Sequence, residues 1–117
     1  MKILKIKELL GAEVLSGEDL IDGEVHSACG CDMMSDVLAF VKDQAVLLTG
    51  LCNPQVVRTA TMMDMRCIVF VRGKHPSAEV ISLAHDAGIA VLATDMRMYT
   101  ACGILYANGL HGGEYLI

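Results

Sequence analysis

The sequence has 117 residues, of which 54% are hydrophobic and 20% are charged, so it suits one folded domain and is too apolar for a disordered chain. Its net charge of −5 argues against the phosphate backbone of a nucleic acid as the main partner. No apolar run approaches the roughly 20 residues of a membrane helix, and residues 1–8 show no signal peptide. We therefore expect a single domain over residues 1–117 that works in the cytoplasm, with neither a membrane nor a nucleic acid as partner.

Helix-like and strand-like patterns alternate along the chain, with short turns between them. Apolar residues three and four positions apart indicate helices, whereas compact apolar runs bounded by turns indicate strands. The expected elements are, in chain order, a helix over 2–10, a strand over 12–15, an extended segment over 24–29, a helix over 33–43, a strand over 45–49, a helix over 54–64, a strand over 66–71, a helix over 77–87, a strand over 89–93 and a helix over 97–108.

Capping residues support two of the helix starts. Asp32 or Ser35 is expected to cap the helix over 33–43, since both residue types accept hydrogen bonds from free N–H groups. Asn53 and Pro54 stand in the order favoured at a helix start, so Asn53 is expected to cap the helix that Pro54 opens.

The compact apolar runs at 45–49 and 89–93 are typical of strands covered on both faces. Strands with helices between them at this spacing predict right-handed βαβ crossovers. The sequence therefore predicts an α/β fold of three layers, a mostly parallel sheet with helices on both faces.

Three loops, 49–53, 72–76 and 94–97, follow predicted strands and lead into helix N-termini. Ligands of open α/β sheets bind beyond the carboxyl ends of the strands, where free N–H groups of helix starts favour anions. A phosphate or carboxylate ligand is one reading of these loops, and ordinary solvated loop residues are the other. The candidate ligand-binding residues are Thr49, Gly50, Asn53, Arg72, Gly73, Lys74, His75, Thr94, Asp95 and Arg97.

Sequence motifs of catalysis are missing from the chain. It contains no nucleotide phosphate loop, no dinucleotide fingerprint and no nucleophile elbow. The histidines show no metal-ligand spacing, and nothing in the sequence brings two carboxylates together. We therefore expect no catalytic residues and no cofactor.

Five cysteines, an odd number, favour free thiols in a reducing compartment. Cys29 and Cys31 are first read as structural residues. Their spacing would also let them reach one soft metal or act as a redox pair, which is the alternative function. A structural zinc site needs about four ligands, however, and no second cysteine pair is visible. Cys67, inside the apolar run 67–71, is expected to be plain core.

Methionines at 62, 63 and 65 form a cluster near the end of the helix over 54–64. Methionine fills irregular gaps in a core, and it also forms soft surfaces for protein contacts. We take core filler as the first reading and a contact surface as the second.

The order of elements resembles a stand-alone DRTGG domain, related to the N-terminal domain of HPr kinase/phosphorylase and found in some phosphotransacetylases and CBS-domain pyrophosphatases. The segments that carry the resemblance are VLSG at 14–17, CDMMSDVL at 31–38, VLLTG at 46–50, CIVFVRG at 67–73, VISLA at 80–84 and GIAVLAT at 88–94.

The resemblance implies a three-layer α/β domain like that N-terminal domain, with no catalytic machinery of its own. It also implies a regulatory or dimer-forming module beside an enzyme. We therefore expect a non-catalytic regulatory module, a homodimer, that works with a separate enzyme or signalling subunit and senses a small phosphorylated ligand or nucleotide. The high apolar content supports the homodimer, since excess apolar surface in a small chain needs a cover.

Overall fold

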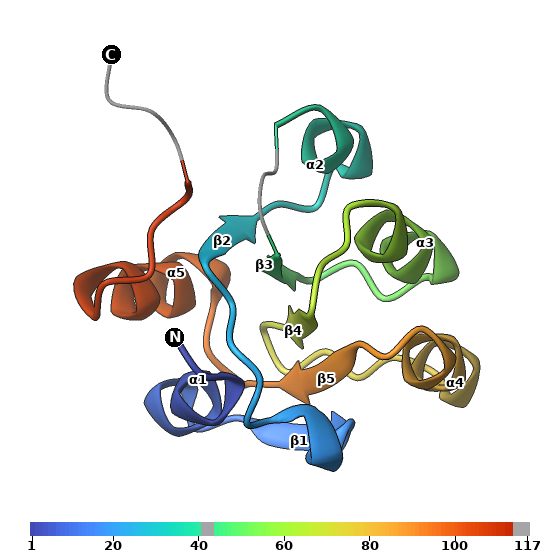
Figure 1. The fold of residues 1–117 in the computed structure, drawn as a ribbon, viewed down its shortest axis with the longest axis horizontal. Helices are drawn as coiled ribbons and strands as arrows, with labels where there is room; N and C mark the ends of the chain where they lie inside the picture. The colour runs from blue at the N-terminus through green and yellow to red at the C-terminus, as the bar shows by residue number, and fades with distance from the viewer. Residues whose placement is uncertain (41–43, 114–117) are drawn as a thin grey trace.

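A computed structural model describes residues 1–40 and 44–113 of the chain. Figure 1 shows their helices and strands. The elements are α1 (Ile3–Leu10), β1 (Glu13–Ser16), the 3₁₀ turn η1 (Glu18–Leu20), β2 (Ser27–Gly30), α2 (Met34–Phe40), β3 (Ala45–Thr49), α3 (Pro54–Met62), β4 (Cys67–Phe70), α4 (Ala78–Asp86), β5 (Ala90–Ala93) and α5 (Met98–Ala107).

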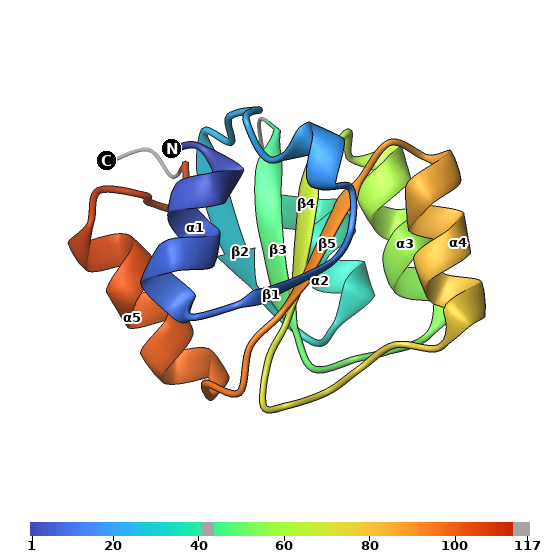
Figure 2. The ribbon, with the colours of Figure 1, turned by 90° about the horizontal axis from the view of Figure 1, so that it is seen from below.

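The five strands form one sheet in the order β1-β5-β4-β3-β2. Strands β2 to β5 are parallel, and β1 pairs with β5 in the antiparallel direction. Helices α1 and α5 cover one face of the sheet, while α2, α3 and α4 cover the other (Figures 1 and 2). The expected three-layer α/β fold with a mostly parallel sheet is confirmed.

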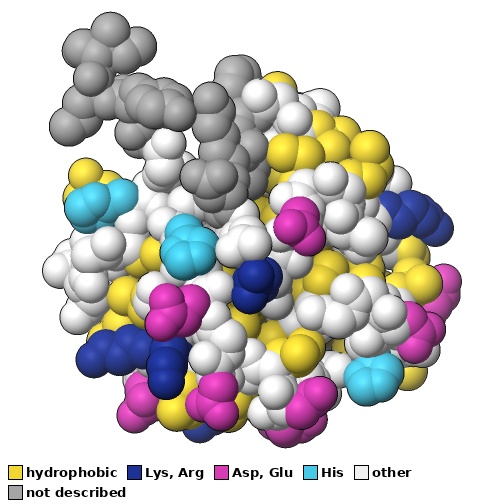
Figure 3. Space-filling view, viewed as in Figure 1, with side chains coloured by type: hydrophobic (Ala, Val, Ile, Leu, Met, Phe, Trp, Pro, Cys, Tyr) yellow, Lys and Arg dark blue, Asp and Glu magenta, His cyan; other side chains and the backbone are white. Residues whose placement is uncertain are grey.

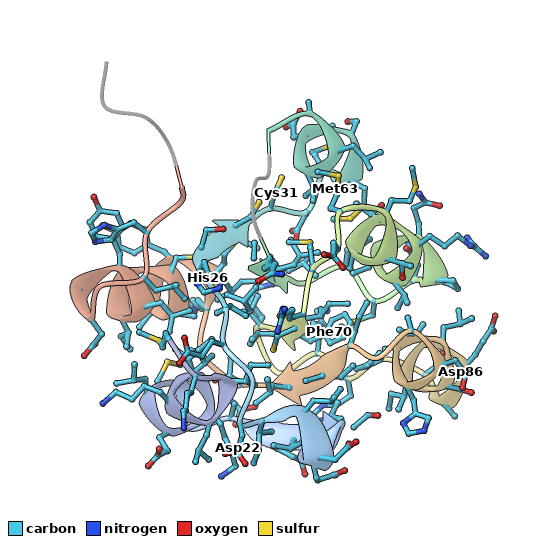
Figure 4. All side chains as sticks on the ribbon, in the orientation of Figure 1. Asp22, His26, Cys31, Met63, Phe70 and Asp86 are labelled. Atoms are coloured by element: carbon cyan, nitrogen blue, oxygen red, sulfur yellow. The ribbon has the colours of Figure 1, made fainter. Side chains whose placement is uncertain are left out.

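Alternate residues of the central strands build the two halves of the core. In β3, Val46 and Leu48 pack towards α1 and α5, whereas Leu47 packs towards α2, α3 and α4. Phe70, at the end of β4, is the largest fully buried side chain and lies on the second of these faces (Figure 4). Cys67 is fully buried, as expected of a core residue.

Most element boundaries fall within two residues of the expected ones. Two boundaries and one helix cap differ from expectation. The extended segment expected over 24–29 becomes a strand only at Ser27. Helix α2 spans Met34–Phe40, and the remainder of its expected range, 41–43, lies outside the described residues. Asn53 occupies the N-cap position of α3 with extended backbone, but its side chain makes no capping hydrogen bond, so that expectation was wrong.

The two edges of the sheet are finished differently. Strand β1 closes one edge, with an irregular register between Val14 and Ser16. At the other edge, the N–H of Ala28 in β2 donates to the carbonyl oxygen of His111 at 2.9 Å. The His111 ring stacks on Tyr106 of α5 with 4.2 Å between ring centroids, which holds this tail segment beside the strand.

Helix lengths also bear on the membrane question. The longest helix of the described residues is α5, with ten residues. None of the helices in residues 1–40 and 44–113 has the length and apolar character needed to span a bilayer.

Candidate functional site

The carboxyl ends of β2, β3, β4 and β5 meet at one edge of the sheet, because these strands run in parallel. The loops that leave them lie together at the lower side of Figure 2. This edge carries the three loops that the sequence singled out, at 49–53, 72–76 and 94–97. A fourth loop, which follows β2 and contains Asp32, joins them.

Asp32 links the loops after β2 and β3. Its Oδ1 accepts hydrogen bonds from the Thr49 hydroxyl and from the Gly50 N–H, both at 2.8 Å. The expectation that Asp32 caps the following helix is therefore wrong, since its carboxylate binds the neighbouring loop instead. The Gly50 N–H is the largest influence on the pKa of Asp32 and holds it below its usual value. Burial comes second and raises this pKa, while the Thr49 hydroxyl and then Arg72 lower it further.

Arg72 brings a cation to the same place from the loop after β4. Its Nη2 lies 3.6 Å from Oδ2 of Asp32, and both side chains remain close to half exposed, at 45% and 43%. A Cβ built on Gly50 would lie 2.6 Å from Cζ of Arg72. Only a glycine at position 50 leaves room for the guanidinium group in this position.

The backbone at Arg72 turns sharply to reach this position. Arg72 and Gly73 have φ values of 61° and 70°, in the left-handed region that glycine enters easily and arginine enters at a cost. The N–H of Arg72 donates to Met96 at 2.7 Å, and that of Gly73 donates to Thr94 at 3.0 Å. These bonds to the loop after β5 hold the turn and, with it, the start of the arginine side chain.

Two of the predicted residues serve the fold with their side chains. The buried hydroxyl of Thr94 donates to the carbonyl oxygen of Leu10 at 2.8 Å and accepts from the N–H of Met96 at 3.2 Å. The His75 ring lies 3.2 Å from the Gly73 carbonyl oxygen and 3.4 Å from Oε1 of Glu13. Both therefore have partners within the chain, away from the Asp32 carboxylate.

The remaining predicted residues line the loops as exposed polar groups. Asn53, Lys74 and Arg97 are exposed and make no side-chain hydrogen bond or ion pair within the described part of the chain. Asp95 is also exposed, with its Oδ1 3.3 Å from the position of a Cβ on Gly73. The structure thus brings Thr49, Gly50 and Arg72 together, while Asn53 and Arg97 stand at the starts of two different helices.

Two further residues, Asp32 and Cys52, lie with Thr49, Gly50 and Arg72 in what we call the carboxyl-edge cluster. The sequence analysis did not include these two residues among the candidate ligand-binding residues. Charges on Arg72, Lys74 and Asp32 all act on the Cys52 thiol, although burial is the main influence and raises its pKa. The other loops were chosen because each follows a predicted strand. The same criterion would have included Asp32 if the extended segment expected over 24–29 had been predicted as a strand that ends at Gly30. The loop after β2 would then have qualified as a fourth loop at a strand's carboxyl end.

The cysteine pair lies at the carboxyl end of β2 beside α2, where Figure 4 labels Cys31, the residue before Asp32. Burial, together with the nearby Cys31, Cys102 and Asp36, raises the pKa of Cys29 to about 11. A thiol with this pKa is almost entirely protonated at neutral pH, which disfavours nucleophilic attack. No group of three metal-ligating side chains occurs within residues 1–40 and 44–113.

The carboxyl-edge cluster can hold an anion but offers little for bond breaking. Around Arg72 it presents a half-exposed guanidinium group and a nearby lysine, which are side chains that bind phosphates. The carboxylate nearest to Arg72, that of Asp32, is held in its ionised form by its hydrogen bonds. An ionised acid of low pKa is a poor proton shuttle at neutral pH.

Residues 5–107 match the DRTGG domain. The chain belongs to the DRTGG domain family. This match runs from within α1 to the end of α5, so the resemblance inferred from the sequence is confirmed. No curated protein matches the sequence of this DRTGG domain.

A solved structure of similar fold is that of the CBS and DRTGG domains of the regulatory region of Clostridium perfringens pyrophosphatase, complexed with its activator, diadenosine tetraphosphate. The two chains are 19% identical, with a TM-score of 0.71. The alignment covers 89% of the present chain and 45% of the pyrophosphatase chain, so the DRTGG domain described here spans less than half of that region. At this identity the likeness establishes the fold.

Proposed function

We propose that this DRTGG domain is a non-catalytic regulatory module that binds a small phosphorylated ligand, such as a nucleotide, at the carboxyl edge of its sheet. We further propose that it acts as a homodimer on a separate enzyme or signalling subunit in the cytoplasm. The observation that carries the ligand site is the cluster of Asp32, Gly50 and Arg72, where a half-exposed guanidinium group stands over the loop that leads into α3.

The pyrophosphatase region of similar fold supports the regulatory part of the proposal. That region contains a DRTGG domain, belongs to the regulation of an enzyme and was solved with a nucleotide activator. The five free cysteines suit a reducing compartment.

Thermal unfolding with added ligands tests the binding site. The probes are inorganic pyrophosphate, ATP and diadenosine tetraphosphate, each added over a range of concentrations. A ligand that binds only the folded chain and is present at about 100 times its Kd adds about 2.7 kcal/mol of stability. A rise in Tm with at least one probe is expected, and no rise with any of them would contradict the proposed ligand site.

Two arginines, one on each side of β4, supply a matched pair of variants. Arg72→Gln removes the cation at the carboxyl end of the strand, whereas Arg66→Gln removes an exposed cation just before its amino end. The proposal expects Arg72→Gln to weaken the thermal response and Arg66→Gln to leave it unchanged. An equal loss in both variants would indicate general attraction of anions to positive charge instead of a site.

A further inference from the structure

Two hydrogen-bond donors and one cation of the carboxyl-edge cluster surround a carboxylate of the chain itself. The Thr49 hydroxyl and the Gly50 N–H both donate to Oδ1 of Asp32 at 2.8 Å. The guanidinium group of Arg72 faces the other oxygen, with Nη2 3.6 Å from Oδ2. A hydroxyl, a backbone N–H and a guanidinium group are also the groups that bind phosphate oxygens. The Asp32 carboxylate therefore occupies the place that a phosphate group would take in this site.

The groups that surround the carboxylate are held in position by other contacts. Thr49 ends β3 and is fully buried, and its hydroxyl also accepts from the N–H of Leu51 at 3.1 Å. The planar peptide group that carries the Gly50 N–H is fixed from its other side, because the Thr49 carbonyl oxygen accepts from the N–H of Val71 at 3.0 Å. The backbone N–H of Arg72 is bonded to the loop after β5 at 2.7 Å. These groups therefore keep their arrangement when the carboxylate leaves.

The Asp32 side chain, in contrast, is free to rotate away. It is 43% exposed, so water replaces its hydrogen bonds when the carboxylate swings outward. Asp32 belongs to the loop between β2 and α2, and the start of this loop is fixed separately by the N–H of Cys31, which donates to the Leu48 carbonyl oxygen at 3.0 Å. The carboxylate can therefore leave the donors while β2 stays paired with β3.

We propose that the Asp32 carboxylate is a built-in competitor of the phosphorylated ligand, which binds by displacing it from the Thr49 hydroxyl and the Gly50 N–H. In the ligand-free chain the carboxylate fills the site and balances the charge of Arg72. The displaced carboxylate leaves both donors and the guanidinium group to the phosphate. Affinity is lower than the donors alone would give, because the apparent Kd is the intrinsic Kd divided by the fraction of chains with an open site.

This inference rests on the ligand site in the proposed function and adds how that site is kept closed. Isothermal titration calorimetry with inorganic pyrophosphate and, separately, with ATP measures the Kd directly. Asp32→Ala removes the competitor and is expected to lower the Kd about tenfold. Asp32→Asn keeps an acceptor for the Gly50 N–H but removes the charge, so a decrease of about threefold is expected. Circular dichroism confirms that each variant is folded.

Asp22→Asn is the matched control for the loss of one negative charge. Asp22, which Figure 4 labels, is exposed and precedes Gly23, which lies with Arg66 and Gly88 at the amino edge of the sheet. Acidic and basic side chains are interspersed over that side of the molecule (Figure 3), so the removal of one carboxylate there creates no cationic site. The Kd of Asp22→Asn is expected to stay within about twofold of that of the unchanged chain, because salt screens distant surface charges.

NMR spectroscopy of the unchanged chain follows the carboxylate itself. Saturating pyrophosphate is expected to shift the amide signal of Gly50, which reports that the ligand has reached the donors. It is also expected to move the carboxyl carbon signal of Asp32 towards that of a solvated aspartate, which reports that the competitor has left. The carboxyl carbon signal of Asp22 should stay in place.

Two results would overturn the inference in distinguishable ways. If Asp32→Ala binds pyrophosphate and ATP no more tightly than the unchanged chain does, the ligand site stands but Asp32 does not compete for it. Retention of the Asp32 carboxyl signal at saturation would lead to the same conclusion. If neither the unchanged chain nor the two Asp32 variants bind either probe, the ligand site of the proposed function fails and the inference fails with it.

Discussion

The guanidinium group of Arg72 occupies the space that a side chain at residue 50 would fill. A Cβ on Gly50 would come within 3.0 Å of Nε and 2.6 Å of Cζ of Arg72. The loops after β3 and β4 therefore fit together at the candidate ligand site. Gly50 leaves a space in the first loop, and the long side chain of Arg72 in the second loop fills it.

Gly50→Ala is expected to leave the fold intact and to displace Arg72 from Asp32. The arginine end is flexible and able to swing away, so the cost to stability is small, whereas the position of the cation is lost. Thermal shift with pyrophosphate should then weaken while the Tm of the ligand-free chain changes little. Gly103→Ala, in an open position of α5, is the control and should preserve the ligand response. Equal responses in both variants would show that the Arg72 position does not matter for binding.

Asp32→Asn is expected to destabilise the chain at neutral pH by on the order of 1 kcal/mol, discounted for the exposure of this carboxylate. Because the pKa of Asp32 is lowered in the folded chain, its contribution is present above the unfolded-state value of about 3.9 and is lost as the pH falls through the folded value. The stability difference between the unchanged chain and the variant should therefore shrink on acidification. Urea unfolding at about pH 7 and about pH 3 measures it.

The exposed Asp22→Asn variant is the control for that series. Asp22 makes no side-chain hydrogen bond or ion pair within the described residues, so its replacement should have a small effect. The stability difference between the unchanged chain and Asp32→Asn could instead be the same at both pH values. The carboxylate would then not hold the loop as the structure indicates.

Cys29 is expected to react with iodoacetamide about 100-fold more slowly than an ordinary thiol at neutral pH. Its pKa of about 11, against a reference value of 9.0, reduces the thiolate fraction by that factor. Cys67, which is fully buried, should not react until the chain unfolds. Mass spectrometry of peptides, with labelling in urea as the reference, gives the rates. Rapid labelling of Cys29 in the folded chain would instead revive the redox alternative.

Gly17→Ala is expected to destabilise the chain by roughly 2 kcal/mol, more than Gly11→Ala. Both glycines have a positive φ, of 86° and 56°, so an alanine is strained at either position. A Cβ at residue 17 would also lie 2.9 Å from the backbone Cα of Ala90, whereas nothing lies within 4 Å of one at residue 11. The difference between the two free energies of unfolding isolates the contact with β5.

Local sequence patterns predicted most of this fold, because the apolar or polar character of each segment reflects how deeply that segment is buried. The run at 45–49 is apolar throughout, and β3 is buried at every position. The turn residues around Pro54 likewise marked the start of α3. What could not be predicted depends on partners distant in the sequence. The carboxylate of Asp32 looked like a helix cap, but the Thr49 hydroxyl and the Gly50 N–H were brought to it by the pairing of β2 with β3.

The same reasoning explains the partial prediction of the ligand site. Arg72 and Thr94 each follow a predicted strand, so both were expected at the carboxyl edge of the sheet. The parallel pairing of β4 with β5 places them there. Whether a side chain there is available depends on contacts across the whole chain. Thr94 donates to Leu10, 84 positions away, and no local pattern around residue 94 carries that information.

The carbonyl group of His111 has a consequence for the behaviour of the chain in concentrated solution. Strand β2 ends the sheet, and an uncovered terminal strand recruits strands of other molecules into insoluble aggregates. By accepting from Ala28, with its ring stacked on Tyr106, His111 occupies part of that hydrogen-bonding template. Residues 108–113 thus cover part of this edge through a main-chain hydrogen bond, which the stacked His111 ring holds in place.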